Sequence, residues 1–182
     1  MSNKYGSLSS ILLTAIGEST GFFQWPLEHT DSWRRNQLKG ASKKSCYESI
    51  RRMKSKGLVK VAKKGSNNFL ALTSKGELEK LFVKASISKS NHWDGKWRIV
   101  IFDVPEEARD KRDQLRGLLK RNNFVKLQAS VFINPYPLNR EAIGYLQQSG
   151  LMNYIRIIKV DEMDNDEELR KRFDLNKIRK PQ

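Results

Sequence analysis

The stretch WDGKWRIVIFDVPEEARDKRDQLRGLLKRNNFVKLQASVFINPYP, residues 93–137, decides the fold of the second half of the chain. Its segment Trp97–Phe102 is apolar except for Arg98, which is typical of a strand in the middle of a sheet. Pro105 suits the first turn of a helix, and the two glutamates that follow it lie where carboxylates are favoured. The stretch therefore predicts a buried strand that is followed by a helix.

Further strands and a second helix are expected after that helix. They are strand segments at Phe124–Leu127 and Ser130–Asn134, a helix at Leu138–Gln148, and a last strand at Tyr154–Val160. The order strand, helix, two strands, helix, strand predicts a ferredoxin-like βαββαβ domain of the α+β class.

The first half of the chain has the pattern of a winged helix-turn-helix. Its expected elements, in chain order, are helices at 7–17, 31–39 and 42–57, strands at 58–61 and 69–73, and a closing helix from Ser74. The turn GSNN, residues 65–68, joins the two strands into a wing with a basic tip. We therefore expect an α+β chain in which a winged helix-turn-helix precedes the ferredoxin-like domain.

The helix expected at 42–57 is the candidate recognition helix. Cys46, Ile50 and Met53 recur at helical spacing and form its inner face, so the opposite face is free for the DNA major groove. The wing tip can hold phosphates or reach the minor groove. The residues expected to contact DNA are Lys43, Lys44, Tyr47, Glu48, Arg51, Arg52, Lys63, Lys64, Asn67 and Asn68. The alternative is that Lys44, Glu48 and Arg52 form i, i+4 ion pairs on a solvated surface.

The charge of the chain supports a polyanionic partner. The 182 residues carry a formal net charge of +15, and the excess lies in residues 1–91, which have 17 Lys and Arg against 6 Asp and Glu. A chain this basic is expected to bind nucleic acid, although a basic surface without a partner is the alternative.

Composition also limits the cellular setting. The chain has one cysteine, Cys46, and so can form no internal disulfide, which favours the reducing cytoplasm. The sequence shows neither a secretory signal nor an apolar run that could span a membrane, so no membrane partner is expected.

The polar, serine-rich segment Lys84–Gly95 marks a boundary between two domains. We expect a DNA-binding domain at 1–86, a linker at 87–95, a ferredoxin-like domain at 96–162 and a charged tail at 163–182. The tail runs from acidic to basic residues and suggests a short helix with a loose end.

Three unusual short runs follow the expected winged helix in order: WDGKWR at 93–98, FDVPE at 102–106 and LQASVFINPYP at 127–137. These runs make the chain similar to PaaX-type transcriptional repressors of phenylacetic acid catabolism. Residues 5 to about 160 follow the layout of that family. The resemblance implies a central domain like the small CRISPR-associated adaptation protein, a ferredoxin-like dimer. The repressors carry a third, C-terminal domain linked to sensing an acyl-CoA, whereas this sequence ends soon after Val160, so any small-molecule effector is left unknown.

Asp103 lies at the end of the first strand of the ferredoxin-like domain and has two interpretations. The resemblance to the CRISPR-associated protein matches it to an acid assigned to a metal there, which would be Mg²⁺ or Mn²⁺. One acid per chain suffices only if a dimer brings two together. The structural interpretation, in which Asp103 caps the turn before the helix, is preferred, and no other cofactor and no catalytic residue is expected.

The sequence thus predicts a cytoplasmic, DNA-binding transcriptional regulator, a repressor that binds double-stranded DNA as a homodimer through its ferredoxin-like domain. The first alternative is a metal-dependent endonuclease of the CRISPR-adaptation type that uses Asp103. The second is a scaffold that binds nucleic acid through its charge without choosing a sequence.

Overall fold

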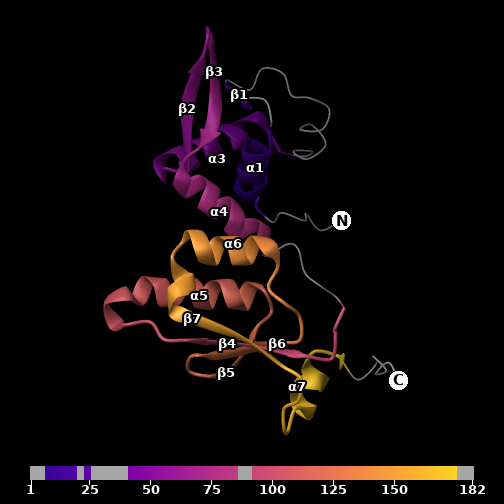
Figure 1. Cartoon of the computed structure of the whole chain (residues 1–182). Coiled ribbons are helices and arrows are strands. Elements are labelled where there is room, and N and C mark those ends of the chain that lie inside the picture. The colour runs from indigo at the N-terminus through magenta and orange to yellow at the C-terminus, as the bar shows by residue number, and fades with distance from the viewer. Residues whose placement is uncertain (1–6, 20–22, 26–40, 86–91, 176–182) are drawn as a thin grey trace. The chain divides into compact units, whose positions relative to one another are not determined.

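The computed structural model describes residues 7–19, 23–25, 41–85 and 92–175. The chain divides into two compact units, Met1–Ile87 and Ser88–Gln182 (Figure 1). None of the helices in the described ranges combines the length and the apolar character that a membrane span requires.

Unit 1 combines helices with a small antiparallel sheet. Its described elements are α1 (Leu8–Glu18), β1 (Phe23–Trp25), α3 (Lys43–Ser55), β2 (Val59–Lys64), β3 (Asn67–Leu72) and α4 (Ser74–Ala85). The strand order is β1-β3-β2, and β2 and β3 form a hairpin that extends beyond the helices in Figure 1. The predicted turn is shorter than expected, because Asn67 and Asn68 already belong to β3. The helix predicted at 31–39 lies outside the described residues.

The core of unit 1 lies where its helices meet the sheet. Leu12 of α1 and Ile50 of α3 are fully buried, and they pack with Val59 of β2 and Leu70 of β3. The α4 helix approaches the residue before β2 so closely that a Cβ atom on Gly76 would lie 1.9 Å from the backbone oxygen of Leu58. Glycine is therefore required at that contact.

Unit 2 has the predicted strand and helix order. Its elements are β4 (Trp97–Phe102), the 3-10 turn η1 (Glu106–Ala108), α5 (Arg109–Arg121), β5 (Val125–Gln128), β6 (Val131–Asn134), α6 (Arg140–Gln148), the 3-10 turn η2 (Leu151–Tyr154), β7 (Ile155–Val160) and α7 (Glu167–Arg172). The four strands form an antiparallel sheet in the order β5-β6-β4-β7. The ferredoxin-like fold predicted for this half is confirmed. One detail differs, because a 3-10 turn precedes α5 where the sequence predicts a single helix from Pro105.

The two faces of this sheet have different surroundings. The α5 and α6 helices lie on the same side of the sheet in Figure 1, and Val100, Phe102 and Phe132 are buried on one face. Strand alternation places Trp97, Ile99 and Ile101 on the other face, which we call the open face. Trp97 is buried there, whereas the Ile101 side chain is 40% exposed.

The segment at 163–175 covers the Trp97 end of the open face. Leu169, Phe173 and Leu175 pack with Trp93 and Trp97 in one apolar cluster. The sequence analysis places this segment in a charged tail, because its apolar residues are scattered among acidic and basic ones. In the structure those apolar residues belong to the core of unit 2.

Candidate nucleic-acid interface

The α3 helix of unit 1 has clear start and stop signals. The Ser42 Oγ accepts a hydrogen bond from the backbone N–H of Ser45 at 3.1 Å and so caps the helix. Gly57 follows the last turn with φ of +68°, a conformation that glycine adopts readily. The sequence therefore fixes the length of this helix locally.

Tertiary packing fixes which side of α3 faces outward. Cys46, Ile50 and Met53 are buried, as their spacing predicts, and burial raises the pKa of the Cys46 thiol. Lys43, Lys44, Glu48 and Arg51 are exposed. The exposed side chains of α3 are thus held outward by an apolar inner face.

The ion pairs expected as the alternative do not form. Within the described residues, Lys44, Glu48 and Arg51 make no ion pair. Arg52 instead donates a hydrogen bond to the Ser49 Oγ at 3.1 Å. The cations of the α3 surface therefore remain available to an external anion.

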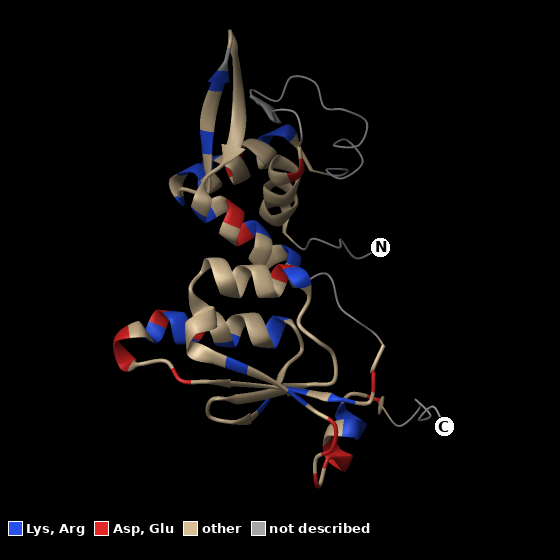
Figure 2. Cartoon of the chain, viewed as in Figure 1, with Lys and Arg blue, Asp and Glu red and all other residues tan. Residues whose placement is uncertain are grey.

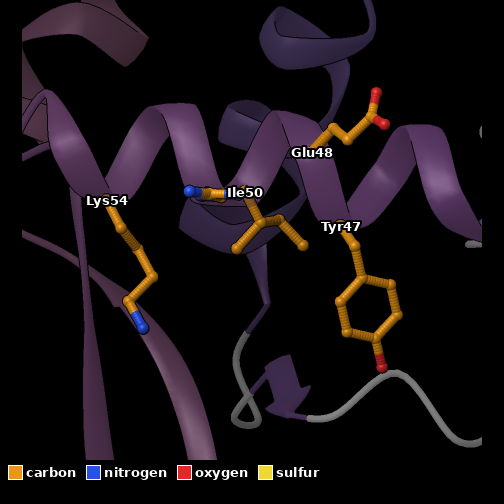
Figure 3. Close-up of a pocket in the computed structure, with 5 residues that line it drawn as sticks. Tyr47, Glu48, Ile50 and Lys54 are labelled. Carbon is orange, nitrogen blue, oxygen red and sulfur yellow. The ribbon is translucent and has the colours of Figure 1, made fainter.

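The predicted DNA contacts on α3 do not share one face. Figure 3 shows Tyr47, Ile50 and Lys54 pointing to one side of the helix, while Glu48 points to the other. All three line a hollow of about 440 Å³, and Glu48 and Arg51 line it too. We call the exposed side that carries Lys44, Glu48 and Arg51 the outer face of α3.

Arg52 lies on the opposite flank from Tyr47. It lines a separate hollow of about 250 Å³, together with Lys56, with serines of α1 and with residues of α4. Since Arg52 is turned toward α1 and α4, it is a weaker candidate for a base contact than Arg51.

The wing is the second basic surface of unit 1. Lys60, Lys63 and Asn67 are exposed, and Asn68 is half-buried. Lys63 is the register partner of Asn68, and Lys64 is that of Asn67, so four predicted residues lie together at the tip. Figure 2 shows the Lys positions of β2 in blue along the strand that leads to this tip. This placement suits contacts to phosphates.

In unit 2, Asp103 follows β4 and its side chain is exposed. Its backbone N–H donates to the Tyr154 carbonyl at 3.0 Å, but neither η1 nor α5 has a side-chain cap. The capping hydrogen bond expected for Asp103 is therefore not formed. In the described part of the chain, no group of three or more His, Cys, Asp or Glu side chains is arranged to hold a metal ion.

The comparison with protein families identifies this half of the chain. Residues 90–171 match the family model described as the PaaX protein central Cas2-like domain. Residues 90–171 of unit 2 are therefore similar to the PaaX central domain. This match indicates a transcriptional regulator of the PaaX type. No curated protein matches the chain.

The WDGKWR motif of unit 2 forms a set of internal hydrogen bonds, which we call the clasp. The Asp94 carboxylate accepts hydrogen bonds from Arg98 Nη1 and Nη2, and it lies 3.4 Å from the Lys159 Nζ. Hydrogen bonds from Arg98 hold the pKa of Asp94 well below its usual range. The Trp93 indole donates to the Lys96 carbonyl at 3.0 Å. The clasp thus holds the first described residues of unit 2 in place before β4 begins.

A buried carboxylate connects β4 and α7, near the two ends of unit 2. The Asp166 Oδ2 accepts a hydrogen bond from the Trp97 Nε1 at 2.9 Å, and its Oδ1 accepts one from the Arg170 Nε at 2.7 Å. The Arg170 guanidinium lies 4.9 Å from the centre of the Trp93 ring. Sequence reasoning missed Asp166, because no local pattern relates it to Trp97.

Two further basic residues beside the candidate interface were missed. Lys54 and Lys60 are exposed, one on α3 and one on β2. The signal was present in the sequence, since residues 41–64 contain nine Lys and Arg and a single acid, Glu48.

Proposed function

We propose that this chain is a DNA-binding transcriptional regulator of the PaaX type, a repressor that acts as a homodimer through its ferredoxin-like domain. The observation that carries the proposal is the outer face of α3. There, cations that have no ion-pair partner among the described residues project from a helix held by a buried inner face. Its presence in one chain with a domain similar to the PaaX central domain gives the DNA-binding surface a regulatory context. A cytoplasmic location is part of the same proposal.

The charge of the candidate interface favours a phosphate backbone as its partner. Eight of its basic residues make no ion pair within the described residues: Lys43, Lys44, Arg51, Arg52, Lys54, Lys56, Lys60 and Lys63. Unpaired Lys and Arg release counterions from DNA when they bind it, which supplies most of the sequence-independent affinity.

The order of elements in unit 1 supports a winged helix-turn-helix. A helix, a short strand, the α3 helix and a two-stranded wing follow one another, and β1 pairs with β3. In that fold the helix before the wing enters the major groove, which is about 12 Å wide. We accordingly assign base contacts to the outer face of α3 and phosphate contacts to the wing.

A dimer would place two such helices on two half-sites of one operator. Binding of the second helix then becomes intramolecular, which raises both affinity and sequence discrimination. Repression follows if the occupied operator overlaps a promoter.

The deciding experiment removes Lys44 and Arg51 together. We expect the double variant Lys44→Ala, Arg51→Ala to bind the promoter DNA of its own operon at least about tenfold more weakly, because each contact contributes about 1–3 kcal/mol. Fluorescence anisotropy with labelled DNA measures the affinity.

The matched control removes the same charge from unit 2, as Arg116→Ala with Lys120→Ala on α5. An equal loss of affinity in both double variants would favour the scaffold that binds by charge alone. Unchanged binding in the Lys44, Arg51 variant would remove the recognition-helix assignment.

One observation favours the nuclease alternative. Asp103 is exposed at the end of β4, where an ion and a phosphate could reach it. The test is to incubate DNA and RNA with the protein and Mg²⁺ or Mn²⁺. Cleavage that disappears in Asp103→Ala would replace the regulator by a metal-dependent endonuclease, whereas cleavage retained in that variant would exclude Asp103.

A further inference from the structure

The sheet of unit 2 has two edges, and they are not alike. The β5 edge has only four residues, and its register shifts between Lys126 and Gln128. A short, irregular strand with a lysine does not readily accept another strand, because it breaks the regular row of hydrogen-bonding groups. This edge is protected against pairing.

The β7 edge also carries cations, Arg156 and Lys159, but it is longer than β5 and has no register shift. Its six residues pair regularly with β4, from Ile155 opposite Phe102 to Val160 opposite Trp97. Among the described strands, β7 has a neighbour on one side only. Its outward backbone groups therefore form a regular row that another strand can complete.

The side chains of β7 add to this contrast. Ile157 and Ile158 point to opposite faces of the sheet, and each is 42% exposed. An incoming strand would cover both isoleucines, one on each face. A regular edge with apolar side chains on both faces is one that proteins normally cover.

We propose that β7 pairs antiparallel with β7 of a second copy of this chain, so that two four-stranded sheets join into one. The inference rests on the proposed homodimer and names the strand that forms it. The partner must supply an extended, regular strand with apolar side chains on both faces, and β7 itself has these properties.

Charge is compatible with this self-pairing, although the chain is strongly basic. Residues that face each other across an antiparallel pair lie on the same face of the sheet. Since Arg156 and Lys159 are on opposite faces, they cannot oppose each other in a two-fold arrangement. With Ile157 at the two-fold axis, Arg156 faces Ile158 of the other copy. With Ile158 at the axis, Arg156 faces Val160 instead.

The cations near this edge have partners within their own chain. Lys159 lies 3.4 Å from the Asp94 carboxylate, and Lys96 forms an ion pair with Asp161. The Arg156 guanidinium donates to the Ile155 carbonyl at 3.0 Å, along its own strand. Two copies can therefore approach along β7 without bringing unpaired lysines together.

The first experiment places single lysines at matched positions and measures mass by light scattering after size-exclusion chromatography. We expect the wild type to be a dimer, and Ile157→Lys and Ile158→Lys to lower dimer affinity at least tenfold. The control is Leu127→Lys on the protected edge, where the leucine is 41% exposed, and it should remain a dimer. Ile101→Lys probes the open face, with a side chain that is 40% exposed. A dimer that breaks only in Ile101→Lys would overturn edge pairing.

The second experiment keeps the apolar character of the strand. The variants Ile157→Cys and Ile158→Cys are each made in the full chain and oxidised. The native Cys46 is buried, so it is not expected to form cross-links itself. A symmetric pair brings the residue at the axis close to itself, so one of the two variants should cross-link in high yield. Leu127→Cys should not. Absence of cross-links at both β7 positions in a dimeric sample would overturn the proposal.

The outcomes separate this inference from the proposed function. If the wild type is a dimer and all β7 variants stay dimeric, pairing through β7 is wrong, but the proposed regulator function is unaffected. If the wild type is a monomer at micromolar concentration, both the pairing through β7 and the proposed homodimer are wrong. The DNA test on Lys44 and Arg51 does not depend on either result.

Discussion

The basic residues of this chain have two different surroundings. In unit 2, Arg98, Arg112 and Arg170 each form an ion pair with a carboxylate of the same unit, at 2.5, 2.7 and 2.7 Å respectively. On the outer face of α3 and on the wing, the described cations have no such partner. The same residue types stabilise a fold in one region and are left for a ligand in the other.

This difference teaches that net charge alone does not locate a binding surface. Residues 92–182 contain 18 Lys and Arg, one more than residues 1–91, but they also contain 14 Asp and Glu. The three-dimensional pairing of these groups decides which cations are available. The comparison can be tested by removing charges from each region and measuring stability and DNA affinity together.

The largest effect is expected for Asp166→Ala in unit 2. The change leaves the Trp97 indole N–H and the Arg170 guanidinium without their shared acceptor, which costs about 2–3 kcal/mol of unfolding free energy in unit 2. Urea denaturation followed by tryptophan fluorescence measures the loss. Substitutions at surface positions ordinarily change stability by about 0.5 kcal/mol or less. A loss within that range would show that the contacts of Asp166 do not stabilise unit 2.

An intermediate effect, on binding rather than stability, is expected for the wing. Lys60→Ala with Lys63→Ala should weaken DNA binding about tenfold and lower the slope of log affinity against log salt by about 2. Unit 1 should keep its stability to within about 0.5 kcal/mol, since both side chains are exposed. Affinities measured at several salt concentrations test this. If the double variant instead loses stability while the salt dependence of its DNA binding stays the same, the wing lysines stabilise the fold and do not contact DNA.

The smallest effect is expected from the Asp94 carboxyl group. The pKa of Asp94 is lowered in the folded chain, so its carboxylate stabilises the fold at pH values above the unfolded pKa of about 3.9. This stabilisation is lost as the pH falls through the pKa of the folded chain. Solvent screens this exposed group, so the effect should stay below about 1 kcal/mol. Unfolding curves between pH 6 and pH 2 should fall less steeply for Asp94→Asn than for the wild type. If stability falls with pH equally steeply in the variant and the wild type, the charge of Asp94 does not contribute to the stability of the fold.

Periodic patterns predicted most of the described elements. The spacing of Cys46, Ile50 and Met53 placed the inner face of α3 correctly, because helix geometry alone relates those positions. The apolar run Trp97–Phe102 predicted β4, and the order of elements predicted the ferredoxin-like fold. The segment at 31–39 stays a prediction, because it lies outside the described residues.

Features that depend on distant residues could not be predicted in the same way. The packing of Phe173 and Leu175 on the open face depends on Trp93 and Trp97, far earlier in the chain. Which flank of α3 faces α1 and α4, the flank with Arg52 and not the one with Tyr47, depends on how the helices pack against one another. The DNA contacts themselves stay predictions, since sequence and structure give exposure and charge but no bound DNA.

The hydrogen bond between Trp97 and Asp166 also has a consequence for biosynthesis. Unit 2 cannot complete this contact until residue 166 has left the ribosome, because 69 positions separate its two partners. Every residue of unit 1 has by then been synthesised. Since N-terminal domains fold first during translation, unit 1, the proposed DNA-binding half, should form in each nascent chain before unit 2, the half proposed to pair two chains.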